Sequence, residues 1–288
     1  MSLKVILSGF CVSLIFGFSF LFTKNALDYV EPLTFLSYRF FVGSLFFLLL
    51  ALTRMIKLER RPYWKLWKLV VFQPILYFLF ETFGLQKISS AEAGMIVALI
   101  PIVVNVLAAF LLKEKGDLLH YTLVISGFAG SILIVGFNIS AQNFAGKLFM
   151  LFAVLSAALY NISSRKLSKE FSPYEITFFM MISGFIFFSL MSLASNRFRI
   201  VLNVSTIFGA LYLGVFSSAV AFFLLNYMVK HASPILTSLF SNFTSVVALV
   251  AGMFFRSESV EIRQIFGICI VLISLLLIAY RKKGTIHR

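Results

Sequence analysis

The sequence is poor in charge. Only 12% of its 288 residues are Asp, Glu, Lys or Arg, whereas a water-soluble domain carries about 25%. Acidic residues are the scarcest, with 11 Asp and Glu against 25 Lys and Arg. In their place 60% of the residues are hydrophobic, Phe alone occupies 36 positions, and the mean hydropathy is +0.99. This composition excludes an ordinary soluble domain and predicts an integral membrane protein.

Cysteine and histidine are also rare. The chain has two cysteines, Cys11 and Cys269, and three histidines that are far apart in the sequence. Neither cysteine has a Cys or His at metal-ligand spacing, so we expect no disulfide framework and no zinc site, and we interpret both as buried thiols. The sequence also lacks a paired-acid, nucleophile-elbow or phosphate-loop pattern. We therefore predict that the protein is not an enzyme and holds no cofactor.

Long apolar runs dominate what remains. A helix needs about 20 apolar residues to cross a bilayer, and the sequence has ten such runs with short connections. They lie at 4–23, 33–53, 67–86, 91–112, 118–137, 146–164, 173–193, 205–229, 234–255 and 261–280.

The distribution of Lys and Arg predicts the orientation of these helices. Connections on one side of the membrane carry 17 of the basic residues and those on the other side carry seven, while Arg39 lies within the second predicted helix. Because Lys and Arg concentrate on the cytoplasmic side, we expect both termini to be cytoplasmic and the membrane to be the cytoplasmic one. The net charge of +14 then faces anionic lipid, and no nucleic-acid partner is predicted.

The two halves of the chain resemble each other. "KISSAEAGMIVALIPIVVNVLAAFLLKEK" (87–115) aligns without a gap with "HASPILTSLFSNFTSVVALVAGMFFRSES" (231–259). The alignment pairs Ser89 with Ser233 and Glu114 with Glu258. This match predicts an internal repeat.

Each repeat contains five predicted helices, an odd number, so the second copy must enter the membrane in the opposite orientation. The sequence therefore predicts an all-α integral membrane fold, in which ten transmembrane helices form two inverted five-helix repeats. We place the repeats at residues 1–140 and 141–288, the second with a short basic C-terminal tail.

Three segments carry a resemblance to a known family. "GFSFLFTKNAL…EPLTFLSYRF" (17–40), "GLQKISSAEAGMIVALIPIVVNVLAAFLLKEK" (84–115) and "NYMVKHASPILTSLFSNFTSVVALVAGMFFRSES" (226–259) resemble the ten-helix EamA-type permeases of the drug/metabolite transporter superfamily. The resemblance covers nearly the whole chain. It implies transport of small metabolites, often amino acids or their relatives and often outward, through a cavity lined largely by helices 3, 4, 8 and 9. The sequence departs from the pattern at Ser245, which stands opposite Pro101, and this leaves open whether helix 9 is kinked like helix 4.

Two polar stripes mark candidate cavity faces. Gln73, Tyr77 and Glu81 follow one another at steps of four in the third predicted helix and so share a face. The ninth predicted helix has a second stripe at i, i+3, i+4 and i+7. This stripe consists of Ser238, Ser241, Asn242 and Ser245. Small and polar residues also serve simply to pack membrane helices closely, so packing remains the alternative for the stripe of the ninth helix.

Other intramembrane polar residues are candidates for binding an amino or carboxyl group. They are Asn105, Tyr160, Asn161 and Asn226. Each of them can equally form a hydrogen bond to a neighbouring helix.

Glu81 and Arg39 are the only acid and base well inside any predicted span, and they lie at similar depth. Because an unpaired charge at that depth is costly, one interpretation is a static ion pair between helices 2 and 3. The other is that Glu81 binds a proton or a substrate ammonium group, which would make proton coupling available to the protein.

A secondary transporter is the leading functional hypothesis, because inverted repeats move around a shared site near the middle of the membrane. We expect a small-molecule substrate and the lipid bilayer as partners; the oligomeric state is left open. A lipid-translocating or purely structural membrane protein is the first alternative, and an integral membrane enzyme is the second.

Overall fold

The computed structural model describes residues 3–111, 118–135, 141–196, 198–201, 203–232, 234–238 and 240–285. Over these residues all regular structure is helical and no strand occurs, as predicted for the fold class. Each apolar range predicted from the sequence overlaps one or more of the helical segments. Ser233 and Glu114, which were paired with Ser89 and Glu258 in the repeat, lie outside the described residues.

The first half of the chain contains these helical segments: α1 (Leu3–Leu27), α2 (Pro32–Leu52), η1 (Tyr63–Leu66), α3 (Trp67–Val70), η2 (Val71–Leu76), α4 (Tyr77–Lys87), α5 (Ser90–Val97), α6 (Ile100–Leu111) and α7 (Leu118–Val135). The second half contains α8 (Ala141–Leu167), α9 (Pro173–Ala194), α10 (Val204–Leu211), η3 (Tyr212–Ala221), α11 (Phe222–His231), α12 (Pro234–Ser238), α13 (Ser241–Arg256) and α14 (Ile262–Thr285). Segment η1 is a 3₁₀ helix and η3 has π-helical hydrogen bonding. Segment η2 contains a kink at Gln73, whose φ of −143° and ψ of 126° are not helical.

Seven helical stretches among the described residues are long and apolar enough to cross a membrane. They are Leu3–Leu27, Pro32–Leu52, Tyr63–Lys87, Ser90–Leu111, Asn143–Leu167, Pro173–Ala194 and Val204–His231. Two shorter apolar helices follow at Ser241–Arg256 and Ile262–Ser274. The protein is therefore a helical membrane protein that crosses the bilayer several times.

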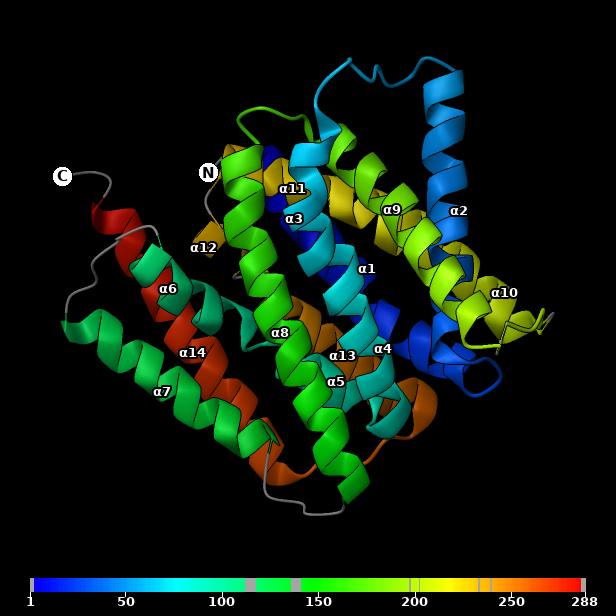
Figure 1. The fold of residues 1–288 in the computed structure, drawn as a ribbon. Coiled ribbons are helices and arrows are strands. Elements are labelled where there is room, and N and C mark those ends of the chain that lie inside the picture. The colour runs from blue at the N-terminus through cyan, green and yellow to red at the C-terminus, as the bar shows by residue number, and fades with distance from the viewer. Residues whose placement is uncertain are drawn as a thin grey trace.

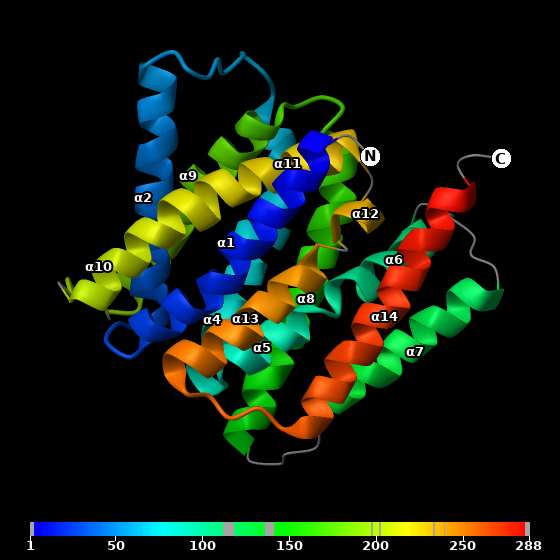
Figure 2. The ribbon, with the colours of Figure 1, turned by 180° about the vertical axis from the view of Figure 1, so that it is seen from behind.

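The helices form a bundle with two flanking pairs (Figures 1 and 2). The pair α7 and α14 packs together on one side, and α2 packs against α9 on the other. Between them α1 packs on α13, α13 on α5, and α4 on α8. The start of α1, the end of α14 and the α2–η1 and α8–α9 connections all lie at one end of the bundle.

Local sequence explains several helix starts. Ser89 is the N-cap of α5, where its hydroxyl accepts a hydrogen bond from the backbone N–H of Glu92, as its spacing predicts. Ser172 and Glu175 form a complete capping box at the start of α9. Proline occupies the first position of both α2 and α9, where its missing N–H costs no hydrogen bond.

One expectation needs correction and one question stays open. Cys11 and Cys269 are exposed, so the prediction of buried thiols is wrong. The surface of a membrane bundle is itself apolar, and apolar neighbours therefore do not imply burial. In the ninth span Phe240 is a turn residue between α12 and α13, and residue 239 lies outside the described residues, so the question of a kink stays open. The fourth span is divided between α5 and α6.

Candidate functional site

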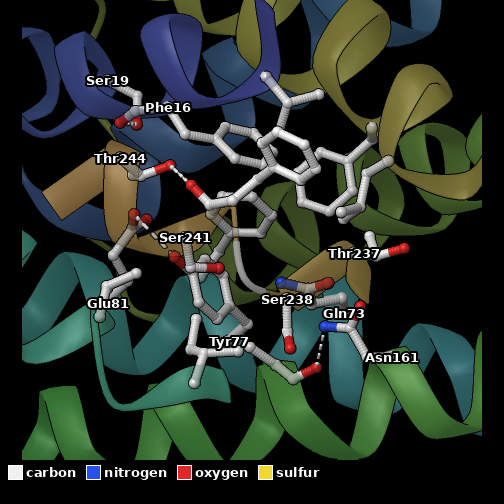
Figure 3. Close-up of a pocket in the computed structure, with 18 of the residues that line it drawn as sticks. Phe16, Ser19, Gln73, Tyr77, Glu81, Asn161, Thr237, Ser238, Ser241 and Thr244 are labelled. Carbon is white, nitrogen blue, oxygen red and sulfur yellow. Dashed lines mark hydrogen bonds between the residues drawn. The ribbon is translucent and has the colours of Figure 1, made fainter. Parts of the chain in front are cut away.

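A small cavity with a largely apolar wall and several polar side chains lies in the middle of the bundle (Figure 3). Segments α1, α2, η2, α4, α8 and α11 surround it, together with the two interrupted spans. Val97 and Ile100 line it at the α5–α6 break, and Ser238 and Phe240 line it at the α12–α13 break. The interruptions in both halves of the chain therefore meet at the cavity.

The cavity wall combines polar groups with aromatic rings. Its volume is about 50 Å³, which leaves room for only a few water molecules. Its ring-bearing lining residues are Phe16, Phe20, Tyr77, Phe78, Phe222 and Phe240. Seven residues predicted from the sequence line it, namely Arg39, Gln73, Tyr77, Glu81, Asn161, Ser238 and Ser241.

Arg39 and Glu81 form a buried ion pair at the cavity. Their side chains are only 1% and 2% exposed, and Arg39 Nη1 lies 3.9 Å from Glu81 Oε2. The hydroxyl of Tyr77 donates to Glu81 Oε1 over 3.4 Å. The pairing between the second and third predicted helices is thus observed, although the separation is longer than that of a hydrogen-bonded pair.

Several buried polar atoms of this wall have no hydrogen-bond partner within the described part of the chain. Buried polar atoms in proteins are nearly always hydrogen-bonded, so their gathering at one cavity is unusual. They are Arg39 Nη1, Gln73 Oε1, Glu81 Oε2, Asn161 Oδ1 and Thr237 Oγ1. The wall therefore has unused capacity to donate and to accept hydrogen bonds.

The remaining predicted residues lie outside this cavity. Tyr160 donates to Asn226 Oδ1 over 2.6 Å, and Asn226 Nδ2 lies 3.1 Å from Thr177 Oγ1, so this group links α8, α11 and α9. Asn105 donates to the carbonyl of Pro101 within its own helix.

Two members of the predicted stripe on helix 9 are also placed away from the cavity. Ser245 donates to the carbonyl of Ser241, and Asn242 is buried. The Oδ1 atom of Asn242 has no hydrogen-bond partner among the described residues. Neither residue lines the cavity, and their role stays a prediction.

Three polar lining residues were missed by the sequence reasoning: Ser19, Thr237 and Thr244. Ser19 is a single hydroxyl in an apolar run, whereas Thr237 and Thr244 each precede a serine of the predicted stripe. Hydroxyls in membrane helices usually bond to their own backbone, so these three gave no strong signal. The weak signal available for Thr237 was its place one residue before Ser238, at the start of the predicted polar stripe.

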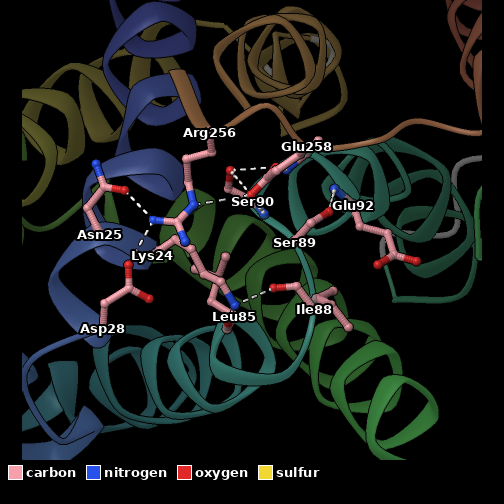
Figure 4. Close-up of polar contacts among 11 residues, drawn as sticks. Lys24, Asn25, Asp28, Leu85, Ile88, Ser89, Ser90, Glu92, Arg256 and Glu258 are labelled. Carbon is pink, nitrogen blue, oxygen red and sulfur yellow. Dashed lines mark hydrogen bonds and ion pairs between the residues drawn. The ribbon is translucent and has the colours of Figure 1, made fainter. Parts of the chain in front are cut away.

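A second polar group ties helix ends together near α1, α5 and α13 (Figure 4). Glu258 accepts hydrogen bonds from the backbone N–H groups of Ser90 and Ala91 at the start of α5, over 2.9 and 2.8 Å. Arg256 lies 3.5 Å from Glu258 and 3.0 Å from Asp28. Glu258 therefore caps the start of a neighbouring helix, α5.

Two lysines complete the contacts at this end of the bundle. Lys24 Nζ donates to the carbonyls of Leu85 and Ile88 over 2.6 and 2.8 Å (Figure 4). Lys147 is buried and lies 3.1 Å from the carboxylate of Glu92. The Glu92 carboxylate thus serves an ion pair with α8, while its backbone N–H takes part in the cap of α5.

Several membrane spans around a central, charged and polar cavity are typical of membrane transporters. The chain belongs to the EamA-like transporter family, whose model matches it twice, over residues 3–136 and 144–280. This family assignment agrees with the resemblance in the sequence.

Relatives with similar sequences are named as transporters. The uncharacterized transporter YcxC of Bacillus subtilis is 33% identical over 276 residues, which cover 90% of this chain and 88% of that protein. An uncharacterized transporter of Archaeoglobus fulgidus is 25% identical over 268 residues, covering 92% and 95%. A crystal structure of another protein matches the fold with a TM-score of 0.75 at 19% identity, covering 98% of this chain and 99% of that one.

Proposed function

We propose that the protein is a secondary transporter that exports a small polar metabolite, an amino acid or a related compound, across the cytoplasmic membrane by alternating access. The observation that carries this proposal is the buried Arg39–Glu81 pair, which leaves charged atoms without hydrogen bonds at the central cavity. Intramembrane charges that face a cavity usually mark a substrate or ion pathway.

The proposed architecture has ten spans in two inverted repeats, residues 1–140 and 141–288. The double match of the family model supports it. So does a contact that recurs in both halves: Lys24 of α1 binds C-terminal carbonyls of α4, and Arg165 of α8 binds the carbonyls of Val229 and Lys230 at the end of α11. Lys24 bonds Leu85, which corresponds to Val229 in the alignment of the repeats.

The interrupted helices support the proposed mechanism. In transporters with inverted repeats, broken helices commonly form the substrate site and the halves rock around it. Here both interruptions border the cavity, and α5 packs on α13 across the proposed repeat boundary. The present cavity is smaller than the roughly 300–1,000 Å³ of typical ligand sites. Binding of a metabolite therefore requires the halves to move apart.

We propose that Glu81 couples transport to a proton or to a substrate ammonium group. Its Oε2 faces the cavity without a hydrogen-bond partner in the described residues, and Arg39 supplies the positive charge that balances the empty state. A proton or ammonium group on Glu81 would compete with Arg39 for the same carboxylate. Loading the site would thus weaken the link between α2 and α4.

The first prediction concerns the substrate and its coupling. A thermal-shift screen with amino acids, nucleosides, sugars and organic cations identifies ligands, and uptake into liposomes holding the purified protein then measures their transport. We expect Glu81→Gln to remain folded but to lose the pH dependence of uptake, because the amide neither takes up a proton nor carries a charge.

Glu92→Gln is the matched control, since Glu92 pairs with Lys147 away from the cavity and should keep the wild-type pH profile. An unchanged pH profile in Glu81→Gln would leave Glu81 with a structural role only. A different outcome would favour a lipid-translocating protein: no solute is taken up in a saturable way, and labelled lipid moves between the leaflets.

A further inference from the structure

The guanidinium of Arg39 is held by two serines from the other half of the chain. We propose that Ser217 and Ser218 of η3 are positioning residues that keep Arg39 apart from Glu81, so that both charged groups stay available to a solute in the cavity. The role of the solute rests on the proposed transport function. The positioning itself is measurable without any solute.

The serines occupy one edge of the guanidinium. Arg39 Nε donates to Ser218 Oγ and Arg39 Nη2 donates to Ser217 Oγ, each over 2.8 Å. These two N–H groups form one edge of the planar fork, and such an edge is what a carboxylate needs for a bidentate pair. Both serines are 0% exposed, so water does not compete for these bonds.

Both hydroxyls that hold the guanidinium come from a π-helical segment. Consecutive residues of an α-helix point in directions about 100° apart, and adjacent side chains of an α-helix therefore do not normally share a target. Ser217 and Ser218 are consecutive, yet both reach the same guanidinium from within η3. Single π-helical turns are rare and often occur at functional sites.

A third contact fixes the face of the guanidinium. The carbon atom Cζ of Arg39 lies 4.2 Å from the centre of the Phe78 ring, a cation–π distance. With one edge and one face held, Arg39 approaches Glu81 only through Nη1, at 3.9 Å from Oε2. A direct charge-assisted hydrogen bond would measure about 2.7–2.9 Å.

This arrangement lowers the stability of the folded protein, but it leaves charged atoms able to form hydrogen bonds with a solute. A direct bidentate pair would satisfy both charged groups and close the site, whereas the observed separation leaves Nη1 and Oε2 unsatisfied at the cavity. Leaving buried charged groups without hydrogen bonds is unfavourable. These two atoms without hydrogen bonds suit a solute that donates a hydrogen bond to Glu81 and accepts one from Arg39 at the same time.

The first test measures the separation directly. Solid-state NMR on protein in lipid, with ¹⁵N in the arginine side chains and ¹³C in the glutamate carboxyls, reports the Arg39–Glu81 distance; Arg39→Lys identifies the signal. In the double variant Ser217→Ala, Ser218→Ala we expect the nitrogen–oxygen contact to shorten to about 2.8 Å. Ser217→Thr, Ser218→Thr keeps both hydroxyls and should restore the wild-type distance.

Ser156→Ala is the matched control for the first test. Ser156 is another buried serine of the bundle, and its hydroxyl bonds only to the carbonyl of Phe152 in its own helix. The control should leave the Arg39–Glu81 distance unchanged. If the double alanine variant does not fold, Ser218→Ala alone removes the Nε bond and serves the same measurement. An unchanged distance in the alanine variants overturns the proposal.

The second test asks whether the separation serves binding. In liposome uptake with L-leucine as the probe, we expect the double alanine variant to raise KM about tenfold, equivalent to about 1.4 kcal/mol, with the maximal rate nearly unchanged. The threonine variant should restore KM. A shortened pair with an unchanged KM also overturns the proposal. If the wild-type protein transports neither L-leucine nor any other solute, the proposed function fails, and the distance measurement still decides the positioning role.

Discussion

Arg39 and Glu81 depend on each other for their burial. Arg39 also holds two serines and a phenyl ring, whereas Glu81 has only Tyr77 as a hydrogen-bonding neighbour. Removing one partner of a buried ion pair typically costs about 3–5 kcal/mol, because the other charge remains buried. We therefore expect Arg39→Ala to lower the unfolding free energy by this amount. Glu81→Gln should lower it less, because Arg39 keeps its hydrogen bonds to two serines and its contact with Phe78.

Unfolding of the purified protein in detergent, followed by denaturant or heat, measures this difference. The double variant Arg39→Ala, Glu81→Ala should be more stable than Arg39→Ala alone, because no carboxylate is then left without its partner. Equal stability of Arg39→Ala and the wild-type protein would show that Glu81 is already neutral at the pH of the experiment.

The sequence made this pair predictable, since Arg39 and Glu81 are the only acid and base deep within the predicted spans. The serines that hold Arg39 were not predictable in the same way. Serine in a membrane helix commonly serves close packing, and nothing in the local sequence distinguishes Ser217 and Ser218 from that use. The available signal was that an arginine within the membrane needs several hydrogen-bond acceptors, which hydroxyl groups such as those of Ser217 and Ser218 can supply.

At the scale of helices, hydropathy predicted where the segments lie but not where they break. Pro101 is next to the α5–α6 interruption, and proline removes a backbone hydrogen bond, so this break had a sequence signal. The α12–α13 interruption has no proline or glycine at residues 239 and 240. Pro74 in η2 is likewise a sequence signal for a local break, because proline disturbs the helix that precedes it. Segment η3 contains no proline, and its π-helical hydrogen bonding was not predictable from the local sequence.

The contact between α5 and α13 yields a prediction about packing. A Cβ atom on Gly94 would overlap the Cβ of Ala248, so the two helices approach as closely as the glycine allows. We expect Gly94→Ala to lower the unfolding free energy by about 1–3 kcal/mol, the usual cost of overpacking. Thermal unfolding in detergent checks this.

Gly209→Ala is the matched control for the packing prediction. A Cβ at Gly209 would meet its nearest neighbours at 3.4 Å, an ordinary van der Waals distance. The control should therefore change stability much less than Gly94→Ala. Equal effects of the two substitutions would mean that α5 and α13 can separate without loss.

At the scale of the whole molecule, the basic asymmetry predicts which end faces the cytoplasm. Lys57 lies in the α2–η1 connection and Asn196 follows α9, and both are exposed. In a variant without Cys11 and Cys269, we expect a cysteine at 196 to react with a membrane-impermeant maleimide in intact cells. A cysteine at 57 should react only after the membrane is permeabilised. Reaction of both in intact cells would contradict the proposed topology.

The small volume of the central cavity also bears on how a cell keeps its membrane energised. A space of about 50 Å³ holds only a few waters, far fewer than a hydrated column through about 30 Å of hydrocarbon would need. Within the described residues this cavity is therefore too small to form a water-filled path across the bilayer by itself. Under the proposed alternating access, each solute would cross only when the helices rearrange to make room for it. Flux would then follow the frequency of rearrangement rather than the width of a pore, and many copies could reside in the membrane without draining its ion gradients.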